Sequence, residues 1–503
     1  MRGLGAGLFS QVILAFIGLW VARFLLQRLG QSQYGLWLVG MQLLAYLALT
    51  DLGVVALLPR EVAYATGRGQ NKGDDLQNIV AETARIILWQ LPIVVLVAAA
   101  FWIFLPSSWE PLRMPLGIVL ISFVVTFPLR APAAILSGLQ DLAFVSILQS
   151  AATFAGTAAT VILVARGRGL ESLAIGWATT QVMVGVVAIV RLAMRFPHSL
   201  PRSLPHLTGQ VLRHRMGQAF WVALSQVAVV LLNATDAVII AQVLGPAAVV
   251  PYVCTAKLIQ FLGNQPQLLM QTAQPGLAEL RASEHQPRVF QAATALTQAV
   301  LMLIGAIACG VLAVNYGFVR LWVGEAQWGG FILTGLLIVR VMLAQWNLTT
   351  ATAIFAFGYE RRLALVGIAD GILFVGITTA LVRHLGIRGA PLAGILALGV
   401  VSLPINLSAL ARESGSTVFG LVRELWPWAW RFAISLAVAG AIATVWRPAS
   451  FLALATAGTV AVAVYGVLTV RRLLHPPLSL YLHPKLGALL RRLTPATRSA
   501  TLA

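Results

Sequence analysis

Nine ionisable side chains lie inside long apolar blocks of the 503-residue sequence, and these residues are the ones best placed to do chemistry there. Six are basic and three are acidic: Arg23, Arg130, Arg191, Lys257, Arg340 and Arg431, and Asp51, Asp236 and Asp370. A charge that faces lipid is costly, so such a residue normally faces a charged partner or a water-filled cavity. We therefore treat the nine residues as candidates for a functional site.

The depth of each basic residue within its block separates the candidates. Lys257 and Arg340 fall near the middle of their blocks and Arg130 in the inner half of its block, so we assign these three to a cavity. Arg191 and Arg431 lie close to a block end, where a long side chain reaches the headgroups without any functional role. Arg23 lies near the other end of its block, and both interpretations stay open for it; we keep it with the cavity candidates.

The acidic residues also have two interpretations. Asp236 and Asp370 either bind H⁺ or Na⁺ and couple its movement to transport, because burial disfavours a lone carboxylate, or pair with Arg or Lys. Asp51 precedes Gly53 near the end of its block. For Asp51 we favour a structural role, either neutralising Arg60 or shaping a helix break, and we retain it as a third candidate for ion coupling.

The elements that position these residues are membrane-spanning helices. Hydrophobic residues make up 59% of the chain and charged residues 10%, whereas soluble proteins carry roughly 25% charged residues. The apolar blocks are each about 20 residues long, which is the helix length that crosses the hydrocarbon of a bilayer. The sequence therefore predicts an all-α polytopic membrane protein with about fourteen spans, near residues 8–26, 36–58, 86–105, 115–137, 143–165, 172–194, 217–241, 246–268, 292–316, 329–355, 363–382, 389–411, 428–446 and 450–470.

The basic residues between the blocks predict the orientation. With the N-terminus inside, the inner segments hold 21 Lys or Arg residues and the outer loops hold 8. Lys and Arg concentrate in cytoplasmic loops of membrane proteins. We expect a multi-pass protein of the cytoplasmic (inner) membrane with both termini in the cytoplasm, and we attribute the net charge of +19 to this topology and not to a nucleic-acid partner. The basic tail 471–503 either lies on anionic membrane lipids or is a solvated tail.

Short loops argue against an enzyme. They leave no room for a soluble catalytic or nucleotide-binding domain, so we predict no catalytic residues and no cofactor. Cys254 and Cys309 each lie inside an apolar block. We expect them to be small buried side chains, and we predict neither a disulfide nor a metal site.

The chain also contains a weak internal repeat. An offset of 215 residues aligns Ser10-Gln11-Val12 with Ser225-Gln226-Val227 and Gly30 with Gly245, and an offset of 220 aligns Gly138 with Gly358 and Arg168-Gly169 with Arg388-Gly389. An even number of spans separates the copies, which predicts two parallel six-helix lobes around a central cavity. The predicted divisions are an N-terminal lobe at 1–194, a basic linker at 195–216, a C-terminal lobe at 217–411, accessory helices at 428–470 and the tail at 471–503.

Two stretches of sequence resemble a known family. The first runs from Leu29 to Trp37, continues through Tyr46-Leu47-Ala48-Leu49-Thr50-Asp51-Leu52-Gly53 and ends at Arg60-Glu61-Val62-Ala63. The second contains Thr235-Asp236-Ala237-Val238-Ile239-Ile240, Leu244-Gly245, Tyr252 and Lys257. Both are similar to the polysaccharide transporter family, which includes the Wzx-type O-antigen flippases, within the multidrug/oligosaccharidyl-lipid/polysaccharide (MOP) superfamily.

The resemblance implies a function. It implies translocation of an undecaprenyl-pyrophosphate-linked oligosaccharide from the inner to the outer leaflet by alternating access, driven by an ion gradient, in lipopolysaccharide and O-antigen biosynthesis. A polysaccharide polymerase and chain-length proteins are the implied partners, besides the glycan substrate and membrane lipids. The related lipid II flippases hold pyrophosphate with basic residues on helices 1, 2 and 8. Arg23 and Lys257 fall on spans 1 and 8 here, but span 2 offers Asp51 and no base.

Two other functions stay open at this point. A drug or organic-cation exporter of the same superfamily would need an acidic or aromatic cavity lining, and the excess of embedded bases over acids argues weakly against it. A membrane polysaccharide polymerase would be expected to carry a large outer loop with Arg or His, and the predicted outer loops are short.

Overall fold

We describe a computed structural model of the chain over residues 2–67, 72–201, 209–282, 286–448, 450–473 and 475–481. Every regular element in these ranges is a helix. The predicted basic tail from residue 482 onward, and residues 202–208 of the predicted linker, lie outside the described residues.

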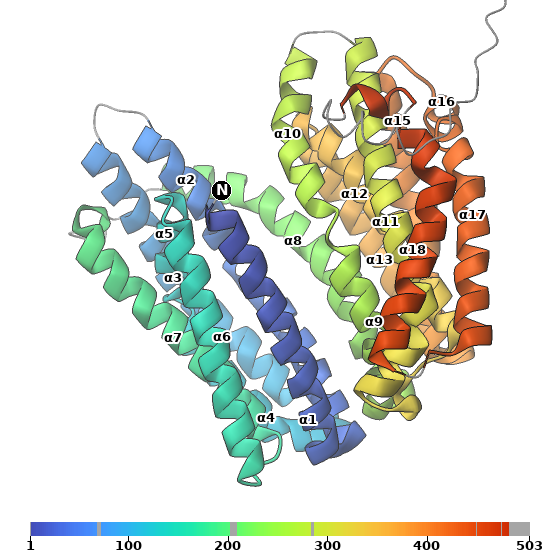
Figure 1. Cartoon of the computed structure of the whole chain (residues 1–503). Helices are drawn as coiled ribbons and strands as arrows, with labels where there is room; N and C mark the ends of the chain where they lie inside the picture. Colours follow the sequence, from blue (N-terminus) through green and yellow to red (C-terminus); the bar gives the residue numbers. More distant parts are fainter. Residues whose placement is uncertain are drawn as a thin grey trace, which may run out of the picture. The chain divides into compact units, whose positions relative to one another are not determined.

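The chain divides into two compact units, Met1–Val250 and Pro251–Ala503. Unit 1 runs from blue to green and unit 2 from green to red in Figure 1. The division falls after the helix that contains span 7, whereas the predicted lobes, which follow the sequence repeat, divide before it. The predicted domain scheme therefore stays a prediction.

Unit 1 is built from eight α-helices, all within its described residues. In chain order they are α1 (Arg2–Ala48), α2 (Val54–Gly67), α3 (Lys72–Ile103), α4 (Arg113–Thr126), α5 (Arg130–Gly138), α6 (Leu142–Ala165), α7 (Glu171–Arg195) and α8 (Gly209–Leu244). Four short 3₁₀ helices also lie in these described residues, at Leu49–Asp51, Ser107–Leu112, Pro197–Ser199 and Pro246–Ala248. The apolar block predicted as one span at 115–137 is interrupted between α4 and α5, where Pro128 cannot donate a backbone hydrogen bond.

Unit 2 contains α9 (Val249–Gly263), which begins at the boundary, and the helices that follow it. They are α10 (Gln267–Ala282), α11 (Gln286–Trp322), α12 (Phe331–Ala356), α13 (Glu360–Leu385), α14 (Gly389–Ala397), α15 (Leu403–Glu413), α16 (Val418–Arg423), α17 (Trp426–Ala441) and α18 (Phe451–Leu473). A π-helical turn, Leu398–Ser402, joins α14 to α15, and another, Ile442–Trp446, extends α17.

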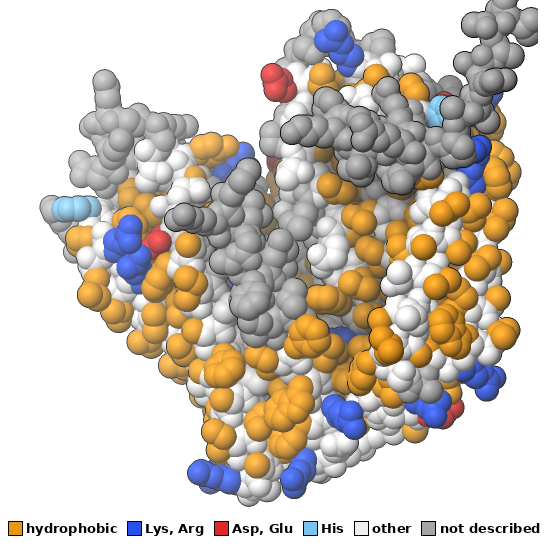
Figure 2. Space-filling view, viewed as in Figure 1, with side chains coloured by type: hydrophobic (Ala, Val, Ile, Leu, Met, Phe, Trp, Pro, Cys, Tyr) orange, Lys and Arg blue, Asp and Glu red, His pale blue; other side chains and the backbone are white. Residues whose placement is uncertain are grey.

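The helices have the length and surface of membrane spans. Within the described residues, 11 helical segments are long and apolar enough to cross a bilayer, or up to 12 if the bent pair Phe16–Asp51 and Val54–Thr66 forms one span. Large hydrophobic side chains such as Leu96 and Ile121 are 69% exposed in mid-helix, as lipid-facing residues are. Figure 2 shows hydrophobic side chains over much of the visible face of each unit. The chain is a multi-pass integral membrane protein.

The long helix α1 is bent at a glycine. Its 47 residues would extend for roughly 70 Å as one straight helix, over twice the thickness of the hydrocarbon. Gly30 interrupts it with a φ of +80°, a backbone conformation that residues other than glycine rarely adopt. Gly245, which the 215-residue offset aligns with Gly30, has a φ of +91°. The two glycines thus have similar backbone conformations, as repeated segments are expected to have.

Small residues and specific hydrogen bonds hold each unit together. In unit 1, α6 and α7 approach closely because Gly156 has no side chain: a Cβ atom at this position would meet the backbone oxygen of Gly176. In unit 2, Tyr465 of α18 donates a hydrogen bond to the Met302 carbonyl of α11 at 2.9 Å and accepts one from the Trp428 indole of α17 at 2.8 Å. These bonds attach the last two long helices to α11.

Candidate functional site

Arg340 is the centre of a charged cluster inside unit 2. It lies on α12, half-buried, and its Nη1 donates to the Tyr252 hydroxyl of α9 at 3.4 Å. Its guanidinium carbon lies 4.9 Å from the centre of the Phe374 ring on α13. It also interacts electrostatically with Asp370 on the same helix as Phe374. A cation–π contact and a phenol thus hold the cation within electrostatic range of a carboxylate.

Asp370 is fully buried, with no exposed surface. Its Oδ2 accepts a hydrogen bond from the Ser402 hydroxyl, whereas its Oδ1 has no hydrogen-bond partner among the described residues. Because Asp370 and Phe374 are four residues apart on α13, they lie on one face of the helix. A carboxylate with one free oxygen in a nonpolar setting is well placed to accept a proton or a cation.

The π-helical turn Leu398–Ser402 brings Ser402 to this cluster. Pro404 has no N–H to donate to the carbonyl four residues before it, which favours a local departure from α-helical bonding. Turns of this kind occur frequently at functional sites. The wide turn lies directly before α15 and ends with the hydroxyl that contacts Asp370.

Gly394 on α14 leaves the space that Arg340 occupies. A Cβ atom at this position would come within 2.8 Å of Cδ of Arg340, and it would also meet Nε. Helix α14 therefore approaches the stem of Arg340 without any side chain between them.

Unit 1 contains a second charged cluster, at the break between α1 and α2. Asp51, only 2% exposed, accepts a hydrogen bond from the Gly53 amide at 2.9 Å through Oδ1, and Oδ2 lies 3.5 Å from Nη2 of Arg130. Gln90 of α3 donates to the Asp51 carbonyl at 3.0 Å. Asp51 pairs with Arg130 and not with Arg60, whose guanidinium lies over the Tyr64 ring.

The structure places the other predicted site residues outside these two clusters. Arg23 on α1 and Lys257 on α9 are exposed. Asp236 on α8 is buried and interacts electrostatically with Tyr46, which hydrogen-bonds the neighbouring Thr235 at 2.5 Å. The structure brings together two pairs of the seven candidates, Arg340 with Asp370 and Arg130 with Asp51. The cavity and ion-coupling roles of all seven stay predictions.

The two basic residues predicted to reach the headgroups have partners of their own. Arg191 pairs with Asp141 at 3.0 Å and lies over the Phe144 ring at 4.5 Å. Arg431 donates to the Pro427 carbonyl and lies over the Trp430 ring at 4.3 Å.

Ser402, Phe374 and Gly394 were not singled out by the sequence. Nothing in the spacing of these residues distinguishes them from packing positions, and only the fold brings them to Arg340 and Asp370. The two cysteines are buried and unpaired, and no group of three metal-ligating side chains occurs in the part of the chain that the structure describes.

The sequence matches the family described as "Polysaccharide biosynthesis protein" over residues 73–332, which is just over half of the chain. The chain belongs to this family. The family that the resemblance predicted is therefore confirmed. A search of curated protein sequences finds no match.

Solved structures with the same fold include a transporter of the MOP superfamily. The structure titled "Lipid II flippase MurJ, inward closed conformation" has a TM-score of 0.65 at 10% identity, covering 93% of this chain and 100% of that chain. An inward-facing multidrug resistance MATE transporter of the MOP superfamily has a TM-score of 0.62 at 13% identity, covering 81% and 96%. The MATE multidrug transporter DinF-BH has a TM-score of 0.56 at 14% identity, covering 81% and 93%. At these identities the likeness establishes a MATE- and MurJ-like fold and no substrate.

Proposed function

We propose that this protein is a flippase that moves a polyprenyl-pyrophosphate-linked oligosaccharide from the inner to the outer leaflet of the cytoplasmic membrane. Family membership supports a role in polysaccharide biosynthesis, and the MurJ-like fold supports a lipid-linked cargo. The observation that carries the proposal is the cation of Arg340, which the helices of unit 2 hold beside a buried carboxylate.

A pyrophosphate that leaves water needs cationic donors to replace its lost hydration. Arg340 offers a planar guanidinium with several N–H donors, which suits phosphate oxygens. Arg23 and Lys257 are exposed and are the further cations that we assign to the cargo path. Arg130, held by Asp51, is less available to cargo.

Asp370 suits the ion-coupling role because it interacts electrostatically with Arg340 and one of its oxygens has no hydrogen-bond partner among the described residues. While it is charged, Asp370 attracts the guanidinium. Binding of H⁺ or Na⁺ at Oδ1 cancels that attraction and leaves Arg340 available to the cargo phosphates. Movement of the ion and binding of cargo are then linked through one side chain, and Asp236 stays a second candidate for this role.

The proposed topology has fourteen spans: two parallel six-helix lobes around a central cavity and two accessory helices, with both termini in the cytoplasm. The segment Glu360–Glu413, counted as one span above, is 54 residues long and turns at Gly386, which has a φ of +62°. It is long enough for two crossings, and so is the bent pair formed by α1 and α2. The 11 segments count Glu360–Glu413 once and do not include the bent pair. Counting Glu360–Glu413 as two spans and adding two spans for the bent pair gives fourteen.

Export of organic cations or drugs is the second candidate function. The buried acids Asp236 and Asp370 favour it, as does a fold shared with multidrug MATE transporters. A membrane polysaccharide polymerase is the least favoured alternative.

Complementation separates these functions. We expect the protein to restore surface polysaccharide in at least one strain that lacks its own flippase, and we expect Arg340→Ala, Lys257→Ala and Asp370→Asn to abolish this while the protein stays in the membrane. Arg383→Ala, which removes an exposed arginine from the end of α13, is the matched control. Resistance to cationic dyes without complementation of any glycan type would favour the exporter. Full activity of both Arg340→Ala and Lys257→Ala would contradict the cationic path.

A further inference from the structure

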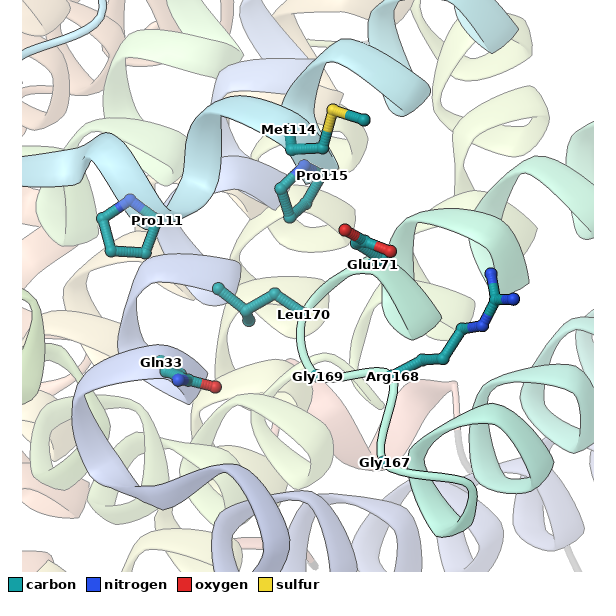
Figure 3. Close-up of a pocket in the computed structure, with 9 residues that line it drawn as sticks. All are labelled: Gln33, Pro111, Met114, Pro115, Gly167, Arg168, Gly169, Leu170 and Glu171. Atoms are coloured by element: carbon teal, nitrogen blue, oxygen red, sulfur yellow. The ribbon is translucent and has the colours of Figure 1, made fainter.

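A pocket of about 370 Å³ opens at one end of unit 1, where the turn between α6 and α7 meets the beginning of α4 (Figure 3). Its walls combine apolar side chains, including Met114 and Pro115, with the polar side chains of Gln33, Arg168 and Glu171. Figure 3 shows the Glu171 carboxylate near Pro115, with Arg168 extending from the same turn. The predicted topology puts this end at the outer surface of the membrane.

The two charged side chains of the pocket are uncommitted. Neither Arg168 nor Glu171 forms an ion pair or a side-chain hydrogen bond with any residue that the structure describes. By contrast, Arg113 at the same end lies 3.6 Å from Glu110 and over the Trp102 ring at 4.5 Å. The pocket therefore holds one positive and one negative group that a ligand can satisfy.

A separate apolar groove of about 520 Å³ lies along the same two helices. It begins one helical turn further on, at Ile118 of α4 and Ile175 of α7, and follows α7 to Val187. Twelve residues of helix correspond to roughly 18 Å, about the thickness of one leaflet of hydrocarbon. The Thr179 hydroxyl in the groove already donates to the Ile175 carbonyl at 2.8 Å. The groove thus offers a ligand little besides hydrocarbon contact.

We propose that this pocket and groove bind one phospholipid whose headgroup carries a phosphate and a primary ammonium, as in phosphatidylethanolamine. The phosphate accepts hydrogen bonds from Arg168, the ammonium donates to Glu171, and an acyl chain lies in the groove between α4 and α7. Charge complementarity selects this occupant. A pyrophosphate-linked cargo would bring several negative charges next to Glu171, and a phosphatidylglycerol headgroup has no cation for that carboxylate.

Native mass spectrometry of the purified full-length protein tests the proposal directly. The protein is mixed with phosphatidylethanolamine, phosphatidylcholine or phosphatidylglycerol that carry identical acyl chains. We expect one tightly held phosphatidylethanolamine, preferred about tenfold over phosphatidylcholine, whose methylated nitrogen cannot donate to Glu171.

The variants separate the two charges from the groove. Glu171→Gln should remove the preference for phosphatidylethanolamine over phosphatidylcholine, Arg168→Gln should weaken binding of both, and Val182→Trp, which fills the groove, should weaken binding of all three lipids. Arg166→Gln and Val190→Trp are matched controls, because both residues are exposed and neither lines the pocket or groove.

Equal retention of phosphatidylethanolamine and phosphatidylcholine by the wild type would overturn the proposal, and so would an unchanged preference in Glu171→Gln. Binding of a free oligosaccharide in place of any phospholipid would also overturn it. The measurement reads lipid retention and not transport, so its result is independent of the proposed flippase activity.

Discussion

Substitution of Gly394 by alanine tests whether the space around Arg340 is needed. The added Cβ would approach Cδ of Arg340 to 2.8 Å, closer than real Cβ contacts occur, so the arginine must move. Movement weakens the contact with the Phe374 ring, worth about 1–2 kcal/mol for a partly desolvated pair. It also weakens the long hydrogen bond to Tyr252, worth about 1 kcal/mol at most.

The expected net change in stability is smaller than this loss. Alanine is favoured over glycine within a helix by about 1 kcal/mol, which offsets part of the cost. We therefore expect Gly394→Ala to lower the free energy of unfolding by at most about 2 kcal/mol. Gly376→Ala on α13 is the matched control, because no atom of the residues that the structure describes lies within 4 Å of its added Cβ. The control should be neutral or stabilising.

A double-mutant cycle makes this reasoning refutable. In an Arg340→Ala background the side chain that clashes with residue 394 is absent, so Gly394→Ala should change sign and stabilise the protein by about 1 kcal/mol. Equilibrium unfolding of the purified protein in mixed micelles, for wild type, both single variants and the double variant, gives the coupling. If the changes in unfolding free energy of the two substitutions are additive, residue 394 does not act through Arg340, which contradicts the proposed clash.

Two further substitutions probe contacts that support the two units. Tyr465→Phe removes the hydroxyl that bonds both the Met302 carbonyl and the Trp428 indole, and we expect unfolding to be easier by about 1–3 kcal/mol in the same micelle assay. Asp51→Asn leaves Arg130 without its carboxylate, and we expect it to lower the free energy of unfolding by about 1–3 kcal/mol. This is less than the loss for a fully buried pair, because the Arg130 side chain is 29% exposed. An unchanged unfolding midpoint would contradict the ion pair.

The membrane class and most of the helices could be predicted from the sequence, because hydrophobic length alone specifies a helix that crosses a bilayer. The interruption between α4 and α5 could not be placed in this way. The block at 115–137 is long enough for one span, and proline inside a transmembrane helix is often tolerated. Hydropathy does not distinguish a kinked span from two shorter helices.

The members of the candidate site could be predicted only as separate positions. Arg340 and Asp370 each stood out as charges in apolar sequence, but they lie in different blocks, and no local pattern pairs them. Asp51 was expected either to neutralise Arg60, the base nearest in the chain after it, or to shape a helix break. It lies at the break between α1 and α2, and the packing of α5 brings Arg130 to it. Partner choice depends on which helices pack together, and the local spacing of residues does not show that packing.

The two charged clusters differ in how completely their carboxylates are satisfied, and this difference supports the different roles that we propose for them. In unit 1, Oδ1 of Asp51 accepts from the Gly53 amide and Oδ2 faces Arg130, so a proton or cation would have to displace an existing partner. In unit 2, Asp370 is more deeply buried, yet within the described part of the chain only its Oδ2 has a hydrogen-bond donor. A buried group with unused bonding capacity is costly to maintain for stability alone. We therefore expect Asp370→Asn to affect transport far more than unfolding and Asp51→Asn to do the reverse, because we propose that the first carboxylate binds an ion, whereas the second stabilises a helix break.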